Sequence, residues 1–123
     1  MPLNLRPDHF TILTDDLDAT ESFYTGLLGF TVGARPNLSS AGLWLYSGGK
    51  PILHVIKVDA LPSERRGVLD HMAFRGDGME DLIAALKARG MEYRLIKTPE
   101  PWQQWQLFFD GPNGERVEVD FDG

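Results

Sequence analysis

The sequence contains no cysteine among its 123 residues. This absence excludes disulfide bonds, thiolate zinc sites, iron–sulfur clusters and cysteine nucleophiles, so any bound metal must use nitrogen and oxygen donors. Long apolar runs are also missing, since segments such as Leu82 to Leu86 end well before the roughly 20 residues of a membrane helix. The segment Met1 to Arg6 lacks the apolar centre of a signal peptide. We therefore expect a cytoplasmic protein with no membrane partner.

Positive charge is scarce as well. The chain has 12 Lys and Arg residues against 18 Asp and Glu residues, which gives a formal net charge of −6. Broad binding to nucleic acid needs a basic face that neutralises phosphates, so we expect no nucleic-acid partner. Hydrophobic residues make up 42% of the chain. A chain of this length buries about two thirds of its unfolded surface, which predicts one domain with a real core over residues 1–123.

The two halves of the chain repeat one order of structural signals. A shift of 62 residues places Asp8-His9-Phe10 on Asp70-His71-Met72. In each half an alternating segment is followed by an amphipathic segment that ends at glycine, and then by three short strand-like runs. We therefore predict module one at about 7–58, a connector at about 59–68 and module two at about 69–121.

The predicted elements of both modules follow the same order. A first strand is expected to include His9 and Phe10 in module one and His71 and Met72 in module two. The first helix is expected to start with a capping box between Asp18 and Glu21. The remaining predicted elements are strands Phe30–Ala34, Leu43–Ser47 and Ile52–Val58, then a helix from Met79 to Arg89 and strands Met91–Lys97, Trp105–Asp110 and Arg116–Phe121. This pattern predicts an α+β fold of two tandem βαβββ modules, whose mixed sheets curl around a cavity.

Four side chains at related places of the repeat are candidate metal ligands. They are His9 and His71 in the expected first strands, His54 in the last strand of module one and Glu118 in the last strand of module two. Strand alternation would let these faces line one cavity if the modules curl around a shared axis. Two histidines and one carboxylate suit Fe, Mn, Ni, Zn or Co and leave positions open for a substrate. The same alternation predicts that Asp8 and Asp70 point away from the neighbouring imidazoles.

A structural interpretation of these residues stands beside the functional one. A lone histidine in a strand is more often a core or surface residue than a ligand, and Glu118 belongs to an acidic stretch that would also suit a solvated strand face. Recurrence at matching places of a duplicated unit favours the metal site. Arg75, Trp44 and Trp105 are candidate substrate contacts, although an arginine at a sheet end and aromatic core residues have structural explanations too.

The opening and the ending of the chain resemble one known superfamily. Asp8-His9-Phe10-Thr11-Ile12 with Leu28-Gly29-Phe30, and the ending from Gly111 through Glu118, resemble the vicinal oxygen chelate superfamily of glyoxalase I, bleomycin-resistance proteins and extradiol dioxygenases. The resemblance covers the chain from Asp8 to Phe121. It implies that His9, His71 and Glu118 are metal ligands. It also implies that His54 is a fourth ligand or a catalytic acid/base, at a position where such proteins usually carry Glu or Gln.

The resemblance also implies a function. We expect one divalent metal ion that is chelated by neighbouring oxygens of a small-molecule substrate, in a lyase, isomerase or dioxygenase, with His54 or Glu118 as the base. Phe108 stands where the dioxygenases carry a tyrosine. A homodimer is expected. The alternative is a non-catalytic small-molecule binding protein of the bleomycin-resistance type, for which the retained ligand residues would have no purpose.

Overall fold

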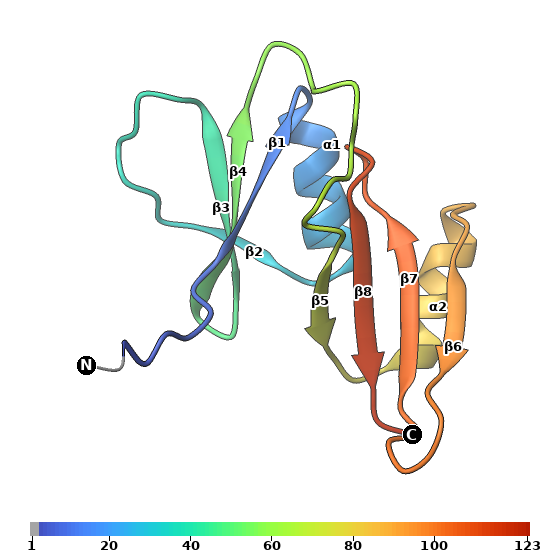
Figure 1. Ribbon diagram of the computed structural model, residues 1–123. Coiled ribbons are helices and arrows are strands. Elements are labelled where there is room, and N and C mark those ends of the chain that lie inside the picture. The colour runs from blue at the N-terminus through green and yellow to red at the C-terminus, as the bar shows by residue number, and fades with distance from the viewer. Residues whose placement is uncertain (1–2) are drawn as a thin grey trace.

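The computed structural model describes residues 3–123 and contains two modules of the same construction (Figure 1). Each module runs strand, helix, strand, strand, strand, as the sequence predicted. Module one contains β1 Phe10–Thr14, α1 Leu17–Glu21, the π-helix η1 Ser22–Leu27, β2 Thr31–Gly33, β3 Gly42–Ser47 and β4 Lys50–Lys57. Module two contains β5 Met72–Arg75, α2 Met79–Ala88, β6 Arg94–Lys97, β7 Trp105–Asp110 and β8 Arg116–Phe121.

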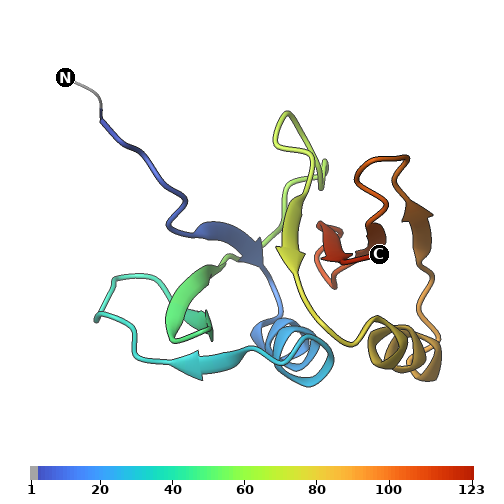
Figure 2. The same cartoon turned by 90° about the horizontal axis from the view of Figure 1, so that it is seen from below.

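Each module forms a four-stranded mixed sheet. The strand order is β1-β4-β3-β2 in one sheet and β5-β8-β7-β6 in the other. The pairs β1/β4 and β5/β8 are parallel, and the other pairs are antiparallel. The helices α1 and α2 lie on the same side of the molecule, while β1 and β5 are the edge strands nearest its middle (Figure 2). The expected α+β fold is confirmed.

The first helix begins two residues earlier than the sequence predicted. Asp16 is the N-cap, and its side chain accepts a hydrogen bond from the backbone N–H of Ala19 at 3.0 Å. The predicted capping box between Asp18 and Glu21 is therefore wrong, because Asp18 already lies in the first helical turn. At the other end the helix is closed by Gly29, whose φ of 77° suits glycine, as predicted.

Two strands are shorter than predicted, and both first strands start one residue after their histidine. β2 covers only Thr31–Gly33. β6 starts at Arg94 because the preceding residues still close α2, where the backbone N–H of Met91 donates to the carbonyl of Leu86. His9 and His71 precede β1 and β5 instead of lying within them. No helix in the described part of the chain is long and apolar enough to span a membrane.

The core lies between the sheets and the helices of both modules. Alternate residues of the central strands point into it, as expected for sheets that are covered on one face. The most completely buried apolar side chains are Leu45, Leu53, Val55, Leu86, Leu107 and Val117. Aromatic contacts continue across the modules, since the ring of Phe74 packs edge-on against Phe10 at 6.5 Å and Phe30 at 5.3 Å between centroids. The two modules therefore share one apolar core.

A buried polar junction also joins the modules. The turn between β7 and β8 places Asn113 against Thr14 at the end of β1 and Thr20 near the end of α1. There Thr14 donates to the Asn113 Oδ1 at 2.8 Å, and the Asn113 amide donates to Thr20 Oγ1 at 3.0 Å. Both threonines are fully buried and Asn113 is 7% exposed. Because a buried amide that loses its partners costs the full desolvation energy, this junction specifies how the modules meet.

The same turn is held by Glu115. Its carboxylate accepts from the backbone N–H of Asn113 and from the hydroxyl of Tyr24, both at 2.8 Å. Tyr24 is fully buried, and burial together with the charge of Glu115 raises the pKa of its hydroxyl far above the ordinary value. The Tyr24 hydroxyl is therefore a hydrogen-bond donor to Glu115 at neutral pH.

Replacing Asn113 with Ala should destabilise the protein by about 1–3 kcal/mol, because Thr14 and Thr20 lose buried partners. Urea unfolding followed by circular dichroism measures this change as a lower midpoint. Asn37→Ala is the matched control, since Asn37 is exposed and should change the stability by less than about 0.5 kcal/mol. Equal midpoints for the two variants would contradict the assignment of Asn113 as the junction residue.

Candidate functional site

Strand register places the candidate donors of the two modules in equivalent positions. In module one, Thr11 of β1 and Trp44 of β3 are both paired with His54 of β4. In module two, Ala73 of β5 and Phe108 of β7 are both paired with Glu118 of β8. The histidines of the repeat, His9 and His71, lie two residues before Thr11 and Ala73. His9 is therefore the diagonal neighbour of His54 on the adjacent strand, and His71 is the diagonal neighbour of Glu118. His54 and Glu118 are counterparts, as the repeat predicted.

The donors of module two converge on each other. His71 Nε2 lies 3.0 Å from Glu118 Oε1, and Glu118 is only 5% exposed. The other carboxylate oxygen, Oε2, accepts a hydrogen bond of 3.3 Å from the Gln106 side chain on β7. Burial and, next, the neighbouring carboxyl of Asp120 raise the pKa of Glu118, while His71 opposes this change.

The spacing of this pair fits a metal ion. A nitrogen and an oxygen that bind one divalent cation at about 2.1 Å, at angles between 90° and the tetrahedral value, lie about 3.0–3.4 Å apart. The 3.0 Å between His71 Nε2 and Glu118 Oε1 falls in this range. A buried carboxylate beside an imidazole nitrogen is also the mixed donor set that borderline transition metals prefer. The residues present in module two therefore fit two adjacent ligand positions.

The donors of module one stack instead of converging. The imidazoles of His9 and His54 are 3.7 Å apart between centroids at 14°, and the indole of Trp44 covers the other face of His54 at 3.9 Å and 10°. His54 Nε2 donates to the carbonyl of Pro51 at 3.1 Å. Burial lowers the pKa of His54, and the neighbouring His9 lowers it further. Three aromatic rings from three neighbouring segments of the sheet thus form one continuous stack.

Asp8 and Asp70 contact the histidines, contrary to the sequence prediction. His9 Nδ1 donates to Asp8 Oδ2 at 2.6 Å, and His71 Nδ1 donates to Asp70 Oδ2 at 2.8 Å. These hydrogen bonds lower the pKa of both carboxyls. The prediction was wrong because the four residues precede their strands, where strand alternation does not apply. A carboxylate at Nδ1 leaves Nε2 as the nitrogen that can bind a metal.

A single chain does not gather all four donors into one cage. Among residues 3–123 no three His, Asp or Glu side chains lie close enough together to hold one ion. The donors form one pair on each sheet, His9 with His54 and His71 with Glu118. Within one chain the two pairs are therefore separate, and the sequence left open whether the modules pair within or between chains.

The three candidate substrate contacts lie in different places. Trp44 stacks on His54 and shares the face of the candidate donors. Trp105 packs against the buried core beside Leu107, on the other face from Glu118, and Lys97 lies over its ring at 5.0 Å. Arg75 is exposed, and its guanidinium donates to Asp122 at 3.0 Å and to Gln104 at 2.7 Å. Only Trp44 is therefore brought next to a candidate metal ligand.

Two neighbours of Glu118 were not predicted as site residues from the sequence. Gln106 donates to its carboxylate, and Asp120 contributes a side-chain oxygen, Oδ1, that is buried without a hydrogen-bond partner among the described residues. Strand alternation indicates that Asp120 shares a face with Glu118, because it lies two residues later on β8. Gln106 required the β7/β8 register, which pairs it with Asp120.

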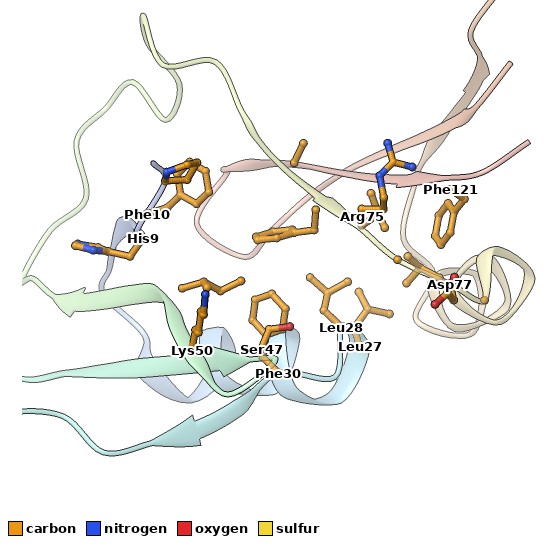
Figure 3. Close-up of a pocket in the computed structure, with 18 of the residues that line it drawn as sticks. His9, Phe10, Leu27, Leu28, Phe30, Ser47, Lys50, Arg75, Asp77 and Phe121 are labelled. Carbon is orange, nitrogen blue, oxygen red and sulfur yellow. The ribbon is translucent and has the colours of Figure 1, made fainter. Parts of the chain in front are cut away.

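A separate cavity of about 890 Å³ lies between the modules on the helix side (Figure 3). Its walls combine apolar residues such as Phe10 and Phe30 with charged ones, among them Lys50, Arg75 and Asp77. His9 also borders the cavity, but its ring points away from the centre (Figure 3). His54, His71 and Glu118 are not in its lining. The cavity therefore borders the donor face at His9 and Ala73 without enclosing the other three candidate donors.

Comparisons with known proteins agree with this fold. A family model described as the Glyoxalase/Bleomycin resistance protein/Dioxygenase superfamily matches residues 6–119. A protein of Arabidopsis thaliana named "Glyoxylase I 4" is 29% identical over 96% of this chain and 72% of its own length. The structure of a lactoylglutathione lyase from Agrobacterium tumefaciens superposes with a TM-score of 0.69 at 21% identity, covering 98% of this chain and 95% of that one. TnmS3, an antibiotic binding protein from Streptomyces sp. CB03234, superposes with a TM-score of 0.70 at 22% identity over all of both chains.

The hydrogen bond between Asp8 and His9 predicts the tautomer of His9. In metal-free protein with a neutral imidazole, His9 should carry its proton on Nδ1, because the Asp8 carboxylate accepts it. Nitrogen-15 chemical shifts of the ring measure this directly. Asp8→Ala should move the population toward the Nε2–H tautomer, whereas Asp15→Ala, at an exposed position away from the histidines, should not. An unchanged His9 tautomer in Asp8→Ala would contradict the prediction.

Proposed function

Because the chain belongs to the Glyoxalase/Bleomycin resistance protein/Dioxygenase superfamily, we propose that it is a divalent-metal-dependent enzyme acting on a small substrate with two neighbouring oxygens. One observation carries the proposal: His71 Nε2 and the buried Glu118 carboxylate lie 3.0 Å apart, the separation of two adjacent ligands on one ion. In a binding protein without a metal the same contact would be an ion pair between His71 and the buried Glu118, so metal content decides between the two functions. The site residues support a catalytic metal rather than a structural one, because two histidines and one carboxylate leave positions open.

The third ligand, His9, comes from a second copy of the chain in this proposal. Both pairs lie near an edge strand, since His9 precedes β1 and His71 precedes β5, and among residues 3–123 no further strand pairs with either edge. Exposed sheet edges favour pairing with another chain, and a two-fold axis would bring β1 of one protomer to β5 of its partner. A homodimer of this kind would hold two metal sites, each with His9 from one protomer and His71 and Glu118 from the other.

The protein's own residues would orient the ligands and handle the proton. A bound divalent cation supplies stabilisation of negative charge that develops on a substrate oxygen. Asp70 holds the His71 ring through Nδ1, and Gln106 holds the second oxygen of Glu118, so both ligands are fixed before a metal arrives. In this proposal Glu118 would also serve as the base, taking a proton from a substrate carbon when its carboxylate leaves the metal.

Among the reactions of this class, we propose lyase or isomerase chemistry. Phe108 presents a ring edge to His71 at 5.9 Å between centroids and carries no hydroxyl, so a proton donor expected in ring-cleaving dioxygenases is missing at this position. The similarity to "Glyoxylase I 4" and to a lactoylglutathione lyase supports the same choice. Turnover of a glutathione–α-oxoaldehyde adduct would support it, and oxygen uptake with catechols would contradict it.

Metal analysis of protein purified without chelator tests the site. The wild type should contain close to one divalent metal per chain, and a variant with both His9→Ala and Glu118→Gln should contain almost none. Asn37→Ala is the control, since Asn37 is exposed and far in sequence from every candidate ligand. Negligible metal in wild type and double variant alike would favour the alternative, a sequestering protein like the antibiotic-binding structural neighbour.

Mixing two single variants tests whether each site is shared between protomers. Neither His9→Ala nor Glu118→Gln should bind metal alone. After unfolding and joint refolding in equal amounts, the mixture should recover about one quarter of the wild-type metal, because half of the dimers are mixed and each mixed dimer has one intact site of two. No recovery would contradict a site built from two chains.

A further inference from the structure

We propose that His54 is a positioning residue and not a metal ligand. Its ring stacks on the imidazole of His9 and orients it, and the indole of Trp44 holds the His54 ring in place. This inference rests on the proposed metal function and assigns the roles of two further residues at that site. The observation behind it is the continuous stack of His9, His54 and Trp44, with neighbouring ring centroids 3.7 and 3.9 Å apart.

His54 is fixed on three sides. The indole of Trp44 covers one face of its ring and the imidazole of His9 covers the other, at interplanar angles of 10° and 14°. The edge that carries Nε2 is occupied by the hydrogen bond to the carbonyl of Pro51. These contacts follow from the sheet, because Trp44 lies directly opposite His54 on β3 and His9 is its diagonal neighbour next to β1.

The stack does not permit His9 and His54 to share an ion. An imidazole nitrogen binds a metal through a lone pair that lies in the plane of the ring. Two nearly parallel rings in face-to-face contact direct their lone pairs side by side, so an ion between them would lie far outside both ring planes. Ligands at 90° to tetrahedral angles around one ion need converging ring planes instead.

The repeat provides an internal comparison. In module two the residue at the position of His54 is Glu118, which has no ring to stack, and its carboxylate turns toward His71 Nε2. The aromatic residue at the position of Trp44 is Phe108, which meets His71 edge-on at 78°. The same strand register therefore gives a converging donor pair in module two, where the residue is the carboxylate Glu118. In module one, where the residue is the imidazole His54, it gives a stacked pair.

The stack leaves His9 with one useful donor. Asp8 holds Nδ1 at 2.6 Å, and the face contact with His54 fixes the plane of the ring. Only Nε2 remains to bind a metal, in a direction set by Trp44 and His54 together. Outer contacts of this kind change metal affinity by about 10- to 100-fold when they are removed.

The first experiment compares His54→Phe with His54→Ala in the full-length protein, using Co²⁺ titration followed by its visible absorption spectrum. Phenylalanine keeps a planar ring between Trp44 and His9 but has no nitrogen. His54→Phe should retain the affinity and the cobalt spectrum of the wild type, whereas His54→Ala should bind about 10-fold more weakly or worse. Equal loss of affinity in both variants, with a changed cobalt spectrum in His54→Phe, would show that His54 is a ligand and overturn the proposal.

The second experiment needs no metal. Nuclear Overhauser contacts between the ring protons of His9 and His54 should be present in the metal-free wild type and lost in Trp44→Ala. The matched control is Trp102→Ala, since Trp102 is 75% exposed on the loop before β7, and it should keep these contacts. Contacts that persist unchanged in Trp44→Ala would overturn the role of Trp44, and their absence from the folded wild type would overturn the stack itself.

The two experiments separate this inference from the function on which it rests. If the wild type binds no cobalt, the proposed metal function is wrong, and the ring contacts alone decide whether Trp44 positions the two imidazoles. If the wild type binds cobalt and Trp44→Ala weakens the affinity to the same extent as His54→Ala, both proposals are supported.

Discussion

The register of the two parallel strand pairs is the constraint on which the candidate site depends. The pairing of Thr11 with His54 places His9 close to His54 on β4. The pairing of Ala73 with Glu118 places His71 close to Glu118 on β8. A shift of one residue in either pair would move His54 or Glu118 to the opposite, core-facing side of its sheet. The register is in turn fixed by the core, because Leu53, Val55, Val117 and Val119 must all point toward the helices. Packing on one face of each sheet therefore decides the chemistry on the other.

The junction between the modules has a second consequence for the site. Asn113, Thr14 and Thr20 exchange buried hydrogen bonds, and the shared aromatic core surrounds Phe74. These contacts hold the two modules of one chain side by side, with their helices on the same side of the molecule (Figure 2). In this arrangement the donor pairs remain separate within one chain. The sharing of a metal between two chains, which we propose, brings His9 of one chain to His71 and Glu118 of another without breaking the junction.

Much of the fold could be predicted from the sequence, because its signals are local. The repeated order of strand, helix and three strands was visible in apolar periodicity and glycine positions, and β7 and β8 were predicted to the residue. The predictions were wrong at the ends of helices and strands, where the periodicity of the element no longer applies. Asp16 caps the first helix instead of Asp18, and Asp8 and Asp70 turn toward their histidines because they lie before the strands. Cytoplasmic residence and the metal's identity stay predictions.

The sequence alone determined which residues of the site are equivalent, since His9 with His71 and His54 with Glu118 follow from duplication. It also determined that any metal site must use nitrogen and oxygen donors, because the chain has no cysteine. Only the tertiary structure decided that Glu118 converges on His71 while His54 stacks between His9 and Trp44. The physical reason is that convergence and stacking depend on cross-strand neighbours. These neighbours are set by register and burial over the whole sheet, and no local pattern of residues contains them.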